Sequence, residues 1–260
     1  MKNPIAITAR ISPKWIKDGT VQGRYALVQQ LENKFYSRIK QYQNSGKDTF
    51  EYIQKSYSYV LEGHKYAIVK NIEPNTNEYS AVWLGRQVMR DGSLSDNITG
   101  YVVKLNNTHT QEDFAGVNIE VLMHESDHLF SYFTNPKYVQ RLIKVSKSET
   151  EELCYEKFFT DYFQSPISTE KCTSALKDFI TNLVPKEQKI DVLQNFRYKL
   201  INEINGYNTG NKYLRKEREL YPDKEYPVIF NQVQIMHLKE KLKMLSEILK
   251  ETIQEERKLR

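Results

Sequence analysis

The alternation of hydrophobic and polar residues divides the chain into a strand-rich part and a longer helical part. Residues 64–72, 79–90 and 98–106 are rich in Tyr, Val, Ile and Trp and are separated by turn-forming residues. This pattern predicts three strands in an antiparallel meander. Apolar residues at helical spacing predict two helices before the strands, at 21–43 and 47–62. We expect these helices to pack against the sheet.

Helical periodicity dominates the chain after the strands. A capping box at 110–113 predicts a helix over about 112–133, and a second capping box, Ser148 to Glu151, predicts another helix that runs to about 163. The break between these two helices is expected at Asn135-Pro136. Later helices, punctuated by prolines, are expected at about 168–183, 187–206, 210–219 and 228–257.

These elements predict an α+β fold in which an antiparallel or mixed sheet and a buried helix are followed by a mainly helical C-terminal half. The expected domain organisation is 1–165, with the sheet and the N-terminal helices, and 166–260, a helical subdomain. The last helix is long and amphipathic. Such a helix either covers its own domain or pairs with a partner protein.

Charge and composition exclude several functional classes. The chain has 260 residues and a net charge of +5, with basic and acidic residues interleaved, so no basic block indicates nucleic-acid binding. No stretch approaches the roughly 20 apolar residues of a membrane span, and the first residues lack the apolar region of a signal peptide. Two cysteines are too few for a disulfide framework. We therefore expect a cytoplasmic or virion-associated protein without a membrane segment.

The strongest chemical signal is the motif His124-Glu125-x-x-His128, which lies within the apolar helix predicted at 112–133. Residues four apart lie one above the other on a helix, so both histidines can direct a ring nitrogen at one zinc ion. Glu125 then lies beside the open position of the metal. There it can act as the general base that takes a proton from a zinc-bound water.

The flanks of the motif resemble the extended zincin signature of metallopeptidases. Val121, three residues before the first His, fits that signature, and so do the apolar residues Leu129 and Phe130 after the second. Asp127 departs from it, because the signature has an uncharged residue between the Glu and the second His. The resemblance further implies that residues 99–104 form an edge strand that pairs with an extended peptide substrate.

A catalytic zinc needs a third protein ligand, and the helix beginning near Ser148 offers one. Glu152 and Glu156 lie on one face of that helix, above an aromatic stripe. Glu152 is the expected third ligand, and Glu156 is expected to accept a hydrogen bond from a ligand imidazole. Glu149 and Glu151 are rival ligands or residues of an acidic first turn. Cys154 is not an alternative, because it lies about 200° around the helix from Glu152.

The two motifs together resemble the gluzincin clan, in which H-E-x-x-H is followed on a second helix by E-x-x-x-D. Glu156 departs from that pattern by replacing the Asp. The resemblance covers roughly residues 64–164 and implies a zinc metallopeptidase that hydrolyses peptide or protein substrates. The alternative is a zincin-like structural or adaptor component of a larger assembly, such as a phage particle, with weak or lost catalysis. Candidates for stabilising an oxyanion are His237, Tyr155, Tyr162, Tyr198 and Tyr207.

Overall fold

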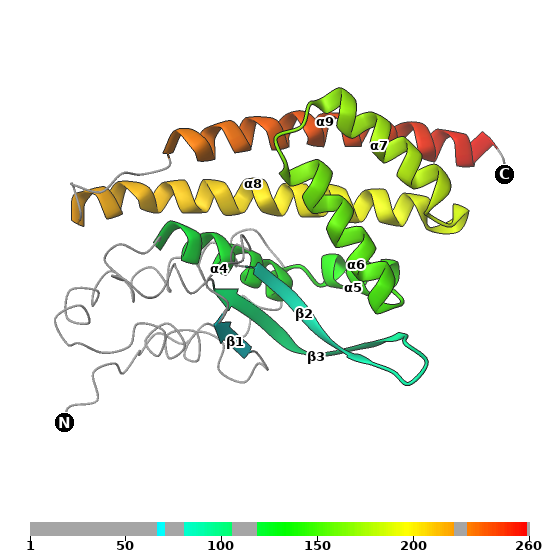
Figure 1. Ribbon diagram of the computed structural model, residues 1–260, viewed down its shortest axis with the longest axis horizontal. Helices are drawn as coiled ribbons and strands as arrows, with labels where there is room; N and C mark the ends of the chain where they lie inside the picture. The colour runs from blue at the N-terminus through cyan, green and yellow to red at the C-terminus, as the bar shows by residue number, and fades with distance from the viewer. Residues whose placement is uncertain (1–66, 71–80, 106–118, 221–227, 259–260) are drawn as a thin grey trace. The chain divides into compact units, whose positions relative to one another are not determined.

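The computed structural model describes residues 67–70, 81–105, 119–220 and 228–258. Within these residues the chain is mainly helical and has one small sheet (Figure 1), which confirms the α+β class. The zincin-like form of that class stays a prediction. The helices predicted before the sheet lie outside the described residues, and so does the capping box at 110–113.

The sheet has three strands in the order β1-β3-β2. These strands are β1 (Ala67–Lys70), β2 (Ala81–Val88) and β3 (Leu94–Leu105). β1 pairs with β3 in parallel, with Ala67 opposite Val102. The last part of β3 therefore has a neighbour on each side, and β1 and β2 are the outer strands among those described.

The predicted antiparallel meander is wrong for β1, and the predicted edge strand at 99–104 is wrong for β3. A meander would place β2 in the centre, whereas β3 is central and β1 pairs with its far side. Strands that are adjacent in sequence pair only about two-thirds of the time. Side-chain alternation shows which face of a strand is apolar, but it does not show which edge of the twelve-residue β3 receives β1.

A tight turn joins β2 to β3. The backbone N–H of Met89 donates to the carbonyl of Ser93 over 2.8 Å, and the N–H of Gly92 donates to the carbonyl of Met89 over 3.0 Å. Gly92 has φ +80°, a conformation that glycine adopts without strain. The Asp91 carboxylate accepts from both the N–H and the hydroxyl of Ser93, and these bonds lower the pKa of Asp91.

The helix that carries the His-Glu motif is α4 (Ile119–Thr134), and its end agrees with the predicted one near 133. A further helix, α5 (Pro136–Val145), starts two residues later and was not predicted. Proline is tolerated in the first turn of a helix, where its missing N–H would have no intrahelical partner. Asn135-Pro136 therefore ends one helix and begins the next.

The predicted N-cap residue Ser148 is confirmed at the start of α6 (Glu149–Phe158). The Ser148 hydroxyl accepts from the N–H of Glu151, and the Glu151 carboxylate accepts from the N–H of Lys147. The helix continues as a π-helix, η2 (Phe159–Gln164), and ends one residue after the predicted end near 163.

The C-terminal part consists of long helices. α7 (Thr169–Asn182) and α9 (Val228–Lys258) agree with the predicted ranges within one residue. Between them, the short η3 (Lys186–Gln188) leads into α8 (Lys189–Leu220), a single helix where two were predicted. The predicted break fell near Gly206 and Gly210, and both glycines are helical and buried. Glycine inside a helix costs only about 1 kcal/mol, which surrounding contacts can offset.

The described chain forms two compact units that are discontinuous in sequence. The first contains β1, residues 81–86 and 98–105, α4 and the end of α8 from Thr209. The second contains the turn region 87–97, the chain from 137 to 208, and α9. The domain boundary expected at residue 165 falls inside this second unit.

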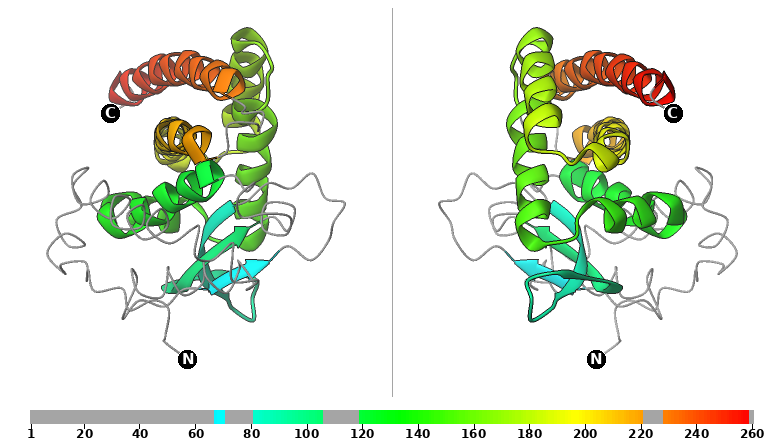
Figure 2. Two further views of the ribbon diagram at one scale, coloured as in Figure 1. Left: turned by 90° about the vertical axis from the view of Figure 1, so that its left-hand side faces the viewer. Right: turned by 90° about the vertical axis from the view of Figure 1, so that its right-hand side faces the viewer.

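The core of the second unit is mainly aromatic. Phe196 of α8 is fully buried, and its ring lies within 6.4 Å, centroid to centroid, of five other aromatic rings. α9 contributes buried residues such as Leu238 and Leu245, and α7 packs beside it (Figure 2). α9 thus covers the core of its own unit, while a partner protein for this helix stays a prediction. None of the helices in the described ranges is apolar over the length that crossing a bilayer requires.

Candidate metal centre

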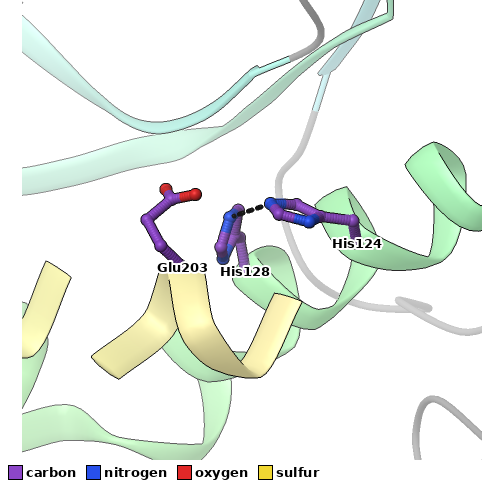
Figure 3. A group of neighbouring side chains, drawn as sticks. All are labelled: His124, His128 and Glu203. Carbon is purple, nitrogen blue, oxygen red and sulfur yellow. Dashed lines mark hydrogen bonds between the residues drawn. The ribbon is translucent and has the colours of Figure 1, made fainter. Parts of the chain in front are cut away.

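The two motif histidines are brought together by one turn of α4. The Nε2 atoms of His124 and His128 lie 2.9 Å apart, and the ring planes are nearly perpendicular, at 89°. Both side chains are half-buried. Figure 3 shows the two rings on the same side of the helix. This is the face-sharing pair that the spacing of four residues predicts.

Glu203 of α8 completes a group of three metal-ligating side chains with this pair (Figure 3). One ligand atom from each of His124, His128 and Glu203 lies within 4.8 Å of the others. Two histidines and one glutamate form a common protein ligand set of catalytic zinc. Among the described residues, this is the group of His, Cys, Asp and Glu side chains that could hold a metal ion.

The spacing of the ligand atoms can be compared with that of a bound zinc ion. With bonds of about 2.1 Å in tetrahedral geometry, neighbouring ligand atoms lie about 3.4 Å apart. The two Nε2 atoms, at 2.9 Å, need to separate by about 0.5 Å, and the widest ligand pair needs to close by at most about 1.4 Å. A small side-chain rotation covers the change within the histidine pair, and two imidazoles with a carboxylate are donor types that suit zinc.

The residues between the two histidines are buried. Glu125 is 6% exposed and Asp127 is 4% exposed. The Asp127 carboxylate accepts a hydrogen bond of 3.3 Å from the hydroxyl of Thr209, which lies on α8 in the same unit. Near the end of α4, the Tyr132 hydroxyl donates to the carbonyl of Val82 in β2 over 3.3 Å. These two contacts attach α4 to the sheet and to α8.

The glutamates that sequence analysis selected lie on α6 and do not belong to this group. Glu152 is half-buried, and its backbone N–H donates to the carbonyl of Ser148. Glu156 is exposed and forms an ion pair with Lys199. This pairing gives Glu156 a partner within the second unit. Ligation of zinc by Glu152 and acceptance of an imidazole hydrogen bond by Glu156 stay predictions.

The rival residues on α6 have other roles in the structure. Glu149 is exposed, and Glu151 caps the start of its helix. Cys154 is exposed. Tyr155, proposed above for an oxyanion, is buried in the aromatic core, and burial is the main cause that raises its pKa to about 12. Tyr198 lies against the ring of Tyr138, with the guanidinium of Arg141 above it.

Glu203 was not predicted, and the pattern of α8 carries no local signal for it. The apolar stripe of Phe196 and Leu200 continues at Ile204, which is buried in the same core, so Glu203 replaces no apolar position of that stripe.

Comparisons of the chain with protein-family models, with curated proteins and with solved structures found no match. The case for a metal centre therefore depends on the chain's own residues. It consists of the H-E-x-x-H motif, the geometry of its two histidines and the Glu203 carboxylate grouped with them.

Proposed function

We propose that this protein is a zinc-dependent hydrolase of the metallopeptidase type, with His124 and His128 as metal ligands. The observation that carries the proposal is the pair of Nε2 atoms 2.9 Å apart on one face of α4, with the buried Glu125 next to the first histidine in sequence. We further propose Glu203 as the third ligand, because its carboxylate belongs to the same group of ligand atoms.

The role of each residue follows from its chemistry. Zinc, when bound, supplies a Lewis acid that polarises a carbonyl and acidifies water. His124, His128 and Glu203 would hold the ion and leave one position open for substrate and water. Glu125 would accept the proton of the attacking water and transfer it to the leaving amine, so that a single carboxylate serves both steps of peptide hydrolysis.

Glu125 is buried, with 6% of its surface exposed. Peptides remain the proposed substrates because of the resemblance of the motif to zincins. In the described sheet, an extended substrate would have to pair with one of the outer strands, β1 or β2.

The proposal is tested with two substitutions in the motif. Glu125→Gln keeps the size of the side chain and removes the base, so it should abolish hydrolysis of a quenched fluorescent peptide mixture and leave zinc bound. His128→Ala removes a ligand and should lose both zinc and activity. Glu255→Gln, an exposed substitution on α9, is the matched control and should change neither. If wild type binds zinc but hydrolyses no peptide, and neither motif substitution alters its biological activity, the structural or adaptor role is favoured instead.

A further inference from the structure

Lys241 of α9 is a charged side chain in the core of the second compact unit, and it is only 1% exposed. Three or four residues to either side, Leu238 and Leu245 are buried in the aromatic and aliphatic core. Lysine is almost never fully buried unless its amine has partners. Burial lowers the pKa of the Lys241 amine, because desolvation penalises the ammonium form. Placing an ammonium here therefore costs free energy, which its contacts must offset.

Both hydrogen bonds of the Lys241 amine go to one end of η2. Its Nζ atom donates to the carbonyl of Phe163 over 3.1 Å and to the carbonyl of Ser165 over 2.6 Å. The last carbonyls of a helix have no intrahelical N–H partner and carry partial negative charge. The ammonium therefore caps the end of η2. Because these acceptors are backbone atoms of an ordered helix end, they accept a donor at one place only.

The other core contacts of α9 are made by an apolar stripe with a repeat of seven residues. α9 packs against α7 and η2 within the second unit. A shift of α9 along its axis by seven residues, a rise of about 10 Å, would again place leucine or isoleucine at most positions of the stripe. Hydrophobic contact is non-directional, so it discriminates weakly between the two registers. The stripe consists of Ile235, Leu238, Leu242, Leu245 and Leu249.

Lys241 breaks this repeat. The equivalent positions seven residues before and after it are Gln234 and Ile248, and neither carries an ammonium. In a displaced register the two carbonyls at the end of η2 would lose their charged donor. One hydrogen bond of a charged group favours its register by a factor of about 10 to 100. Met244, buried beside the stripe, does not repeat either, but its contacts are apolar and non-directional.

We propose that Lys241 fixes the register of α9 on the core of the second unit, because only the native register presents an ammonium to the end of η2. Setting the register of a helix at a cost in stability is the best-attested use of a buried polar group. Lys241 is thus a positioning residue for α9. This role concerns the second unit alone and is independent of the proposed zinc site.

The test measures distances within the full-length protein by double electron–electron resonance between two nitroxide labels. One label is attached to α7 at Lys177→Cys. The other is attached to α9, at Lys239→Cys or at Lys250→Cys, in a Cys154→Ser background; all four positions are exposed. Cys172 is fully buried and should stay unlabelled. The two α9 positions lie about 16 Å apart along the axis, so a shift of about 10 Å cannot leave both distances unchanged.

Lys241→Met removes both hydrogen bonds and keeps an unbranched side chain of similar length. It is expected to add a second, displaced distance by raising the displaced population at least about 10-fold, the factor for one hydrogen bond of a charged group. Lys243→Met, the same substitution at an exposed position of α9, is the matched control and should keep the single distance of the parent. If Lys241→Met does not fold, Lys241→Gln, which is one atom shorter and neutral, is expected to show the same second distance.

The distances separate a register-setting role from a purely stabilising one. A stabilising role alone would lower the urea midpoint of Lys241→Met and leave the folded variant with the single distance of the parent, which would overturn the inference. Two distances in the parent protein would also overturn it. A second distance in the folded Lys241 variant, with one distance in both the parent and Lys243→Met, would support it.

Discussion

The identity of the third ligand gives the sharpest prediction, because two glutamates compete for the role. Glu203 shares a group of ligand atoms with the motif histidines, whereas Glu152 is the residue that the gluzincin pattern indicates. The perturbation is an isosteric one, Glu203→Gln, compared with Glu152→Gln. An amide keeps the shape of the side chain but loses the charge that attracts a zinc ion. We expect only Glu203→Gln to weaken zinc binding.

The size of the effect can be worked out from the number of ligands. Structural zinc sites with four protein ligands bind with about 10–16 kcal/mol, or about 2.5–4 kcal/mol for each ligand. Loss of about 3 kcal/mol corresponds to an increase in Kd of about 100-fold.

The assay is a chelator competition on zinc-stripped protein, with circular dichroism to show that both variants are folded. Glu255→Gln, the exposed substitution on α9, serves as the control. An unchanged zinc Kd in Glu203→Gln, together with a large loss in Glu152→Gln, would refute the assignment of Glu203. It would return the ligand role to α6, as the motif resemblance implies.

Three further predictions concern the second unit. Phe196→Ala should lower the free energy of unfolding in urea titrations by about 3–5 kcal/mol, because it removes a fully buried ring from an aromatic cluster. A loss below about 1 kcal/mol would contradict this packing. At about pH 8, a thiol reagent should label Cys154 rapidly and Cys172 only after denaturation. The reason is that Cys172 is fully buried and that burial raises the pKa of its thiol to about 11. Rapid labelling of both cysteines in the folded protein would contradict this prediction. Burial lowers the pKa of Lys241 in the folded protein below its usual 10.5. Between the lowered pKa and 10.5, the unfolded chain therefore binds more protons than the folded protein, and the free energy of unfolding should rise with pH. This rise should be absent in Lys241→Met. Equal pH dependence of the two unfolding free energies would show that this shift is absent.

Local sequence signals predicted the parts of the fold that depend on neighbours in the chain. The histidine pair on α4 follows from a spacing of four residues, and the start of α6 follows from the capping box at Ser148. The limits of α7 and α9 follow from apolar periodicity and proline breaks. Each of these features is set within one or two helical turns, where sequence and geometry are tightly linked.

The errors arose where distant parts of the chain decide the structure. Pairing of β1 with β3 depends on which edge of a long strand is free, and the alternation of side chains carries no information about that choice. The continuity of α8 depends on contacts that offset the cost of its glycines. Glu203 was missed for a related reason. It lies 75 positions after His128, and only folding of α8 brings it near the motif.

The central proposal is that the His124–His128 pair of α4 binds a zinc ion. The most direct test is the zinc content of purified full-length protein by metal analysis, with His124→Ala measured in parallel. The account predicts about one zinc per chain in the wild-type protein and almost none in the variant. A wild-type protein without zinc, and without uptake on titration with zinc, would contradict it.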